Sequence, residues 1–104
     1  MANFLLIYHG GSEPTSAEEG ERVMAAWTGW FGQLGAAVVD GGQPIAGVRT
    51  VNPNGSVSDG AGNAATGYSI LSAASLDAAV ELAKGCPHLA SGGSVEVAET
   101  NPIM

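Results

Sequence analysis

The segment from Gly67 to Val97 constrains the fold most, because its hydrophobic period changes twice within a short length. Residues 67–71 alternate aromatic or branched side chains with small ones, which is typical of a strand. Residues 75–83 change to a helical period, and residues 92–97 alternate again. The segment therefore predicts a strand, a helix and a strand in close succession.

The first forty residues predict the same order. Phe4 to Tyr8 is a continuous apolar run, which indicates a central strand covered on both faces. Ser16 and Glu19 form a capping box that opens a helix, and Gly35 ends it. Residues 36–40 then predict a second strand. The apolar stripe expected on the buried side of this helix comprises Val23, Trp27, Trp30, Phe31 and Leu34.

The middle of the chain predicts a hairpin. Residues 48–51 and 56–58 have the pattern of short strands, and the Asn54-Gly55 pair between them is expected to supply the positive φ angles of a tight turn. A glycine-rich connection follows at residues 59–66. The second helix is then capped by Ser75, with a buried stripe expected from Leu76, Ala79, Val80 and Ala83.

This element order predicts one domain over residues 1–104, of the α+β class. We expect a ferredoxin-like β-α-β-β-α-β sandwich with an extra mid-chain hairpin, an antiparallel sheet and both helices on one face. The other sheet face must then be covered. A homodimer that stacks two sheets into a dimeric α/β barrel would cover it.

The charge composition narrows the partners. Only 12% of the residues are charged, against about 25% in an average protein, so part of the surface is expected to be covered by a second copy. With 3 basic and 10 acidic residues the net charge is −7, which disfavours nucleic acid and anionic membranes. The single Cys86 excludes an internal disulfide, and no export signal precedes the first strand. We therefore expect a cytoplasmic protein.

Several short stretches, in this order and spacing, resemble the YCII-related family, and more narrowly its branch marked by an Asp-Gly-Pro-Phe motif. The resemblance implies a dimeric α/β barrel, a His–Asp pair of the kind ascribed to some members, and kinship with a dehydrochlorinase placed in that family. The stretches are residues 4–8, 38–42, 58–60, 67–70, 76–83, 86–87 and 92–97.

The chain departs from that family pattern at two positions. Asp59-Gly60 is followed by Ala61-Gly62 in place of Pro-Phe, so an aromatic wall of the usual pocket is missing. Met24 or a neighbour stands where some relatives carry a histidine in the first helix. The family's His–Asp pair is therefore not carried over intact.

His9 and Asp40 are the candidate catalytic residues, since each ends a predicted strand beside two glycines. His9 could act as a general base near neutral pH, or simply cap the strand end. Asp40 could orient the His9 ring, or serve only as a turn residue. Because we expect the first two strands to run antiparallel, a contact between His9 and Asp40 is not favoured.

Tyr8, Asp59 and Tyr68 are candidate ligand-binding residues. The two tyrosines could offer hydroxyl groups to a ligand, although strand tyrosines also belong to cores and interfaces. Asp59 would face the pocket by the family resemblance, or form a turn. We expect no metal site, because Cys86 and His88 lack a second ligand cluster, and no cofactor.

Two functional hypotheses remain open. One is a non-catalytic dimer that binds a small ligand in a pocket between the helices and the sheet. The other is a cofactor-independent lyase or isomerase acting on a small cyclic or aromatic compound, with His9 as general base and Asp40, Asp59 or Tyr68 orienting the substrate. The missing Pro-Phe and the missing helix histidine favour the first.

Overall fold

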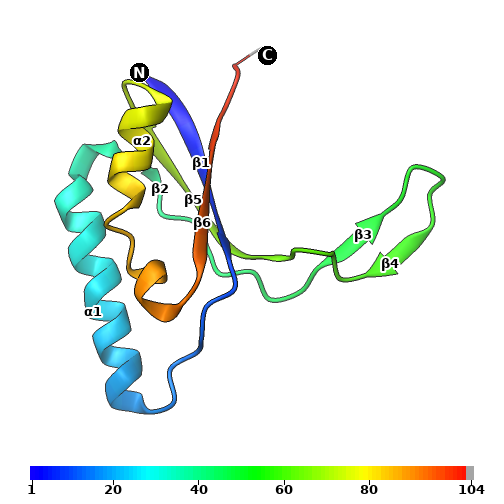
Figure 1. Ribbon diagram of the computed structural model, residues 1–104, viewed down its shortest axis with the longest axis horizontal. Coiled ribbons are helices and arrows are strands. Elements are labelled where there is room, and N and C mark those ends of the chain that lie inside the picture. Colours follow the sequence, from blue (N-terminus) through cyan, green and yellow to red (C-terminus); the bar gives the residue numbers. More distant parts are fainter. Residues whose placement is uncertain (103–104) are drawn as a thin grey trace.

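The computed structural model describes residues 1–102, and it consists of two helices packed on one face of an antiparallel sheet (Figure 1). The helices are α1 (Ala17–Leu34) and α2 (Leu76–Ala83), and two short 3-10 helices are η1 (Gly35–Ala37) and η2 (Pro87–Ser91). The strands are β1 (Ala2–His9), β2 (Val38–Asp40), β3 (Arg49–Val51), β4 (Val57–Asp59), β5 (Ala65–Ala73) and β6 (Ser94–Glu99).

The strand order confirms the predicted fold class. The main sheet has the order β2-β5-β1-β6, and every neighbouring pair is antiparallel. β3 and β4 pair only with each other and form the predicted extra hairpin. Without this hairpin the order is β-α-β-β-α-β, as in a ferredoxin-like sandwich.

β1 is central, but only one of its faces is covered. Phe4, Leu6 and Tyr8 point toward the helices and are buried, whereas the alternate residues Leu5 and Ile7 are half-buried on the opposite face. The prediction of cover on both faces is therefore wrong within one protomer, because both helices pack on the same side. We call the side without helices the uncovered face.

Helix α1 follows its prediction closely. The Ser16 hydroxyl accepts a hydrogen bond from the Glu19 amide at 3.1 Å, while the Glu19 carboxylate accepts from Thr15 instead of completing the capping box. Gly35 ends the helix with a φ of +54°. Trp30 is buried, and Trp27, Phe31 and Leu34 pack against the core beside it.

The other helix and the hairpin turn differ from their predictions. In α2, Ala79 and Ala83 are buried as expected, but Leu76 and Val80 remain 42% and 37% exposed. The buried stripe turns toward Ala78 and Leu82 instead. In the hairpin turn, Gly55 alone has a positive φ. The Gly55 amide donates to the Asn52 carbonyl at 2.8 Å, so the loop is longer than the predicted two residues.

We expect substitution of Gly42 by alanine to destabilise the protein and substitution of Gly32 to stabilise it. Gly42 has a φ of +74°, and an added Cβ would lie 1.6 Å from the Tyr68 carbonyl oxygen, so the free energy of unfolding should fall by about 3 kcal/mol. Gly32 lies inside α1 with open space around it, so Gly32→Ala should raise the free energy of unfolding by about 1 kcal/mol. Urea unfolding checks both, and equal effects would contradict this account of the turn after β2.

Candidate functional site

His9 contacts a carboxylate on the uncovered face, and the sequence analysis did not foresee this contact. Its Nε2 atom lies 2.8 Å from Oε1 of Glu96 in the neighbouring strand β6. Its Nδ1 atom lies 3.4 Å from the carbonyl oxygen of Ala64. The His9 side chain is 12% exposed and that of Glu96 is 61% exposed, so the imidazole is enclosed while the carboxylate reaches solvent.

Strand register explains why these two side chains meet. Ile7 pairs with Glu96 on one side and with Tyr68 on the other, and residues paired across a sheet point to the same face. His9 follows Ile7 by two residues and shares this face. The ladder between β1 and β5 shifts between Tyr8 and His9, at the strand end that carries the pair.

Both partners of the His9 ring are hydrogen-bond acceptors. A carboxylate and a backbone carbonyl are both acceptors, so each bond requires an N–H from the ring. Only the imidazolium, which carries two N–H groups, satisfies both Glu96 and Ala64. In the neutral ring, the bond to Glu96 requires the proton on Nε2, and Nδ1 is then the nitrogen that can accept a proton.

His88 holds the backbone of His9. Its Nε2–H group donates to the His9 carbonyl at 2.9 Å, and its ring lies 5.4 Å from the Tyr8 ring. Two glycines make room for this imidazole: an added Cβ would lie 2.7 Å from it at Gly11 and 2.1 Å at Gly93. The sequence analysis weighed His88 only as a metal ligand. The glycine pairs at 10–11 and 92–93 are the signal that could have indicated a close approach.

Tyr8 lies on the opposite face from His9 and belongs to the core. Its hydroxyl donates to the Ser69 hydroxyl at 2.7 Å, which in turn donates to the Gly41 carbonyl at 2.8 Å. Its ring meets that of Trp27 edge-on, with 5.2 Å between centroids. Burial raises the pKa of Tyr8 well above its usual range, and burial also raises the pKa of the Cys86 thiol.

Asp40 does not contact His9. β1 and β2 each run antiparallel to β5, so they are parallel to each other, and the expectation of antiparallel strands is wrong. β1 and β2 therefore point the same way, but β5 lies between them. Asp40 pairs with Ile70, at the level of Leu5, whereas His9 pairs with Ala65 at the end of the sheet. The Asp40 carboxylate accepts from the Gly42 amide at 2.8 Å, as in a turn.

The other two candidate ligand residues lie apart from each other. Tyr68 is half-buried on the uncovered face, paired with Ile7 and close to the His9–Glu96 pair. Asp59 ends β4 in the exposed hairpin, where its carboxylate lies 3.7 Å from Nε of Arg49. The structure thus places Tyr68 on the same face as His9, opposite Ile7, and leaves Asp59 in a different region.

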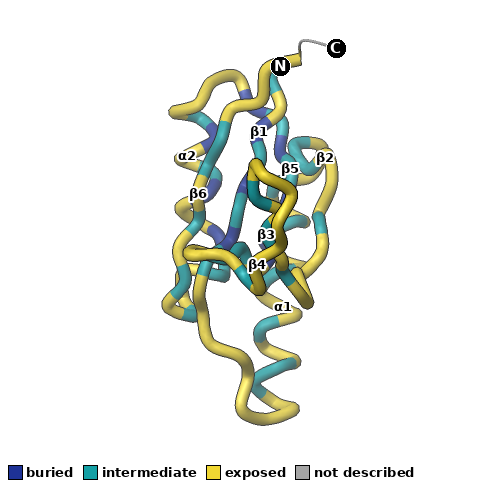
Figure 2. Tube along the Cα trace, turned by 90° about the vertical axis from the view of Figure 1, so that its right-hand side faces the viewer, coloured by how far each residue is buried: buried dark blue, intermediate teal, exposed yellow. Residues whose placement is uncertain are grey.

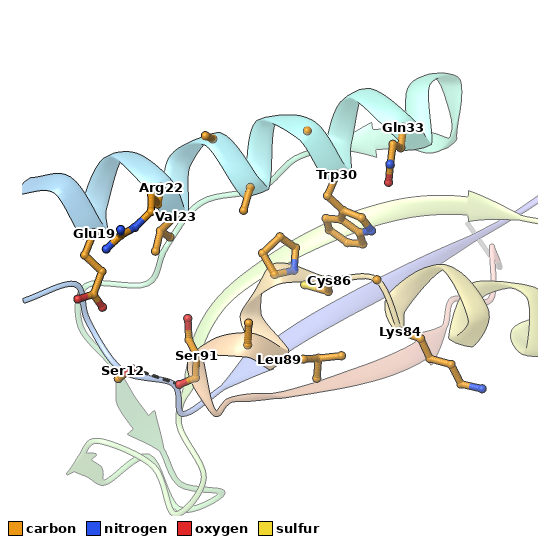
Figure 3. A pocket seen from close by; sticks show the side chains of 16 residues that line it. Ser12, Glu19, Arg22, Val23, Trp30, Gln33, Lys84, Cys86, Leu89 and Ser91 are labelled. Atoms are coloured by element: carbon orange, nitrogen blue, oxygen red, sulfur yellow. Dashed lines mark hydrogen bonds between the residues drawn. The ribbon is translucent and has the colours of Figure 1, made fainter.

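An open groove of about 770 Å³ lies in the helix layer, between α1 and residues 84–91 (Figure 3). Val23, Trp30 and Leu89 contribute apolar walls, and Arg22 and Lys84 lie toward its two ends. Core side chains fill most of the space between the helices and the sheet, where the sequence analysis expected a pocket. A smaller open hollow of about 310 Å³ remains between α2 and β6, lined by Val80, Ala83, Val95 and Val97 among others. No histidine belongs to the described lining of the groove.

Within residues 1–102, no three His, Cys, Asp or Glu side chains gather as they would around a metal ion. No helix in that range combines the length and apolar character needed to cross a membrane.

We expect Gly93→Ala to weaken the fold around His9. The new Cβ would displace the His88 ring and break its bond to the His9 carbonyl, at a cost of about 2 kcal/mol in the free energy of unfolding. Gly47→Ala is the matched control, since nothing lies within 4 Å of its added Cβ. Urea unfolding measures both, and a Gly93→Ala protein as stable as the control would contradict the role given to His88.

Stability is expected to fall in alkali. Since the pKa values of Tyr8 and Cys86 are raised in the folded protein, the unfolded chain releases these protons first as the pH rises. The free energy of unfolding should therefore be intact below about pH 9 and then decrease, by up to about 1.4 kcal/mol per pH unit for each group. Urea unfolding between pH 8 and 11 tests this. The free energy of unfolding of Tyr8→Phe should fall less steeply with pH than that of the wild type. Parallel plots of this free energy against pH would refute the contribution of Tyr8.

The comparison with solved structures finds the same fold in 5-chloro-2-hydroxyhydroquinone dehydrochlorinase (TftG) from Burkholderia phenoliruptrix AC1100, in complex with 2,5-dihydroxybenzoquinone. The TM-score is 0.56 and the identity 20%, over 94% of this chain and 93% of that one. The comparison with curated proteins finds no match. The family model of the YCII-related domain matches residues 3–102, which is nearly the whole sequence. The chain therefore belongs to the YCII-related family.

Proposed function

We propose that this YCII-related protein binds a small cyclic compound on its uncovered face and transfers one of its protons through His9, as a cofactor-independent lyase or isomerase. The 2.8 Å contact between Nε2 of His9 and Oε1 of Glu96 carries the proposal. The missing family motif had favoured a non-catalytic protein. The carboxylate partner supplied by β6 now favours acid–base chemistry.

Each group has a separate role in this chemistry. Glu96 orients the imidazole and stabilises its charged form. We assign Nδ1 as the ring atom that takes the substrate proton, since Nε2 is bound to Glu96 and the contact of Nδ1 with the Ala64 carbonyl is long at 3.4 Å. His9 removes a proton from the ring compound, and the electron pair either takes the proton back at another ring atom or expels a leaving anion. Both outcomes are redox-neutral and require no cofactor.

The surroundings of the pair suit a flat ring. Ile7 lies next to it and pairs with Tyr68, which adds an aromatic ring with a hydroxyl group. Leu5 and Ile70 extend the apolar surface along the strands. Removal of water from such a surface strengthens the electrostatic interaction of His9 with a bound anion. A hydroxylated ring that loses a proton easily would fit this combination of apolar contacts and one cation.

A second copy would close the site as a homodimer, by stacking its sheet on the uncovered face. The half-buried apolar residues of this face are stabilised when a second copy removes them from water. The face carries few of the acidic residues, so two acidic chains can approach each other there with little repulsion. Six of the ten acidic residues belong to the two helices or to the loop before α1, away from this face: Glu13, Glu18, Glu19, Glu21, Asp77 and Glu81.

A non-catalytic ligand-binding role in the helix-layer groove is the second candidate. Its volume of about 770 Å³ lies within the roughly 300–1,000 Å³ of small-molecule sites. No paired base stands among the residues that line it. This groove, and not the uncovered face, would then be the ligand site.

Hydrogen–deuterium exchange of a ring compound separates the two candidates. We expect the protein to accelerate exchange of the ring C–H protons of 2,5-dihydroxybenzoquinone in D₂O, measured by NMR, because exchange needs only proton transfer. His9→Ala should reduce the acceleration by about 10²–10⁴-fold, and Glu96→Gln by less. Ala26→Phe, which partly fills the helix-layer groove, should leave the acceleration of exchange unchanged.

Two outcomes would reject the acid–base proposal. One is the absence of acceleration by the wild type, and the other is equal acceleration by His9→Ala. Binding of the same compound that is lost in Ala26→Phe and kept in His9→Ala would favour the groove as the ligand site.

A further inference from the structure

The β3–β4 hairpin forms an arm that projects from the uncovered side of the molecule. We define the arm as residues 46–64, which contain both short strands. In Figure 1 the helices lie on one side of the sheet and the arm extends from the other. Figure 2, viewed from that side, shows the arm in front of the sheet and almost entirely exposed. Any molecule seated on the uncovered face would therefore lie beside the arm.

The arm carries apolar surface that nothing in its own chain covers. Val51 and Val57 face each other across the hairpin and are 71% and 59% exposed. A two-stranded hairpin is marginally stable in water unless it packs against something else. The exposed valine pair therefore indicates a contact surface for a partner.

The root of the arm is firmly attached beside His9. Pro44 forms an isolated bridge with Gly67, and the Ile45 amide donates to the Thr66 carbonyl at 2.9 Å. Farther out, the Gly60 amide donates to the Val48 carbonyl at 2.9 Å. Where the chain returns from the arm, the Ala64 carbonyl oxygen lies 3.4 Å from Nδ1 of His9. The direction of the arm is therefore set by the same residues that surround the His9 ring.

Charge and area favour a second copy of this chain as the partner. The arm contains one basic and one acidic residue, Arg49 and Asp59, so it is neutral in a chain of net charge −7 and can approach another acidic copy without repulsion. The main sheet has 26 residues in its strands, which at about 16 Å² each cover about 400 Å². This plane is small against the roughly 800 Å² per partner of stable interfaces, so the arm adds needed area.

We infer that the arm is a dimer clasp, which packs its Val51–Val57 pair against a second copy stacked on the uncovered face. Seating the arm would also fix the Ala64 carbonyl, so that dimer formation and the orientation of His9 are coupled. The inference rests on the sheet-to-sheet dimer of the proposed function and adds a contact that the stacked sheets alone do not provide.

Sedimentation equilibrium tests the clasp. The double variant Val51→Asp, Val57→Asp should raise the dimer dissociation constant at least tenfold, because charges would enter an apolar contact. Met24→Asp is the matched control: Met24 is 67% exposed, but on α1 at the helix side, so its dissociation constant should equal that of the wild type. Circular dichroism of each variant checks that the main sheet and helices remain folded.

Hydrogen exchange of the wild type gives a second readout that needs no mutation. The amides of residues 49–51 and 57–59 should exchange more slowly above the dimer dissociation constant than below it. A wild-type protein that stays monomeric at all concentrations would overturn both the dimer and the clasp. A dimer whose dissociation constant is unchanged by the double arm variant, or whose arm exchanges as in the monomer, would overturn the clasp alone.

Discussion

Both helices pack on the same face of one four-stranded sheet, and the rest of the structure follows from that asymmetry. The covered face holds the core, in which Phe4, Leu6 and Leu71 are fully buried. The uncovered face keeps half-buried apolar residues next to a histidine and a carboxylate. A surface of this kind is costly to leave in water, and this is the reason for the proposal that a second copy and a ligand cover it.

The His9–Glu96 pair exists because of register between strands that are far apart in sequence. β1 and β6 are the first and last strands, and their antiparallel pairing places Glu96 opposite Ile7, within reach of the His9 ring. His88 fixes the same strand end from the helix side through the His9 carbonyl. Backbone position and ring orientation are thus controlled from opposite faces of the sheet, as the proposed proton transfer requires.

The fold class was predictable from the sequence because it depends on local period and capping. The alternation in residues 67–71, the Ser16 cap and the Gly35 stop each correspond to an observed element. The candidate functional site was harder to predict from the sequence. Glu96 reads as an ordinary exposed position of an edge strand, and only long-range register makes it the partner of His9. The strand direction that governs Asp40 is likewise a property of topology, which no local pattern encodes.

The central claim is that ligand chemistry takes place on the uncovered face and not in the helix-layer groove. Chemical-shift mapping of ¹⁵N-labelled protein titrated with 2,5-dihydroxybenzoquinone tests it most directly. The account predicts that the largest amide shifts occur at Ile7, His9, Tyr68 and Glu96. Shifts concentrated instead at Arg22, Trp30 and Leu89, with the uncovered face unchanged, would contradict it.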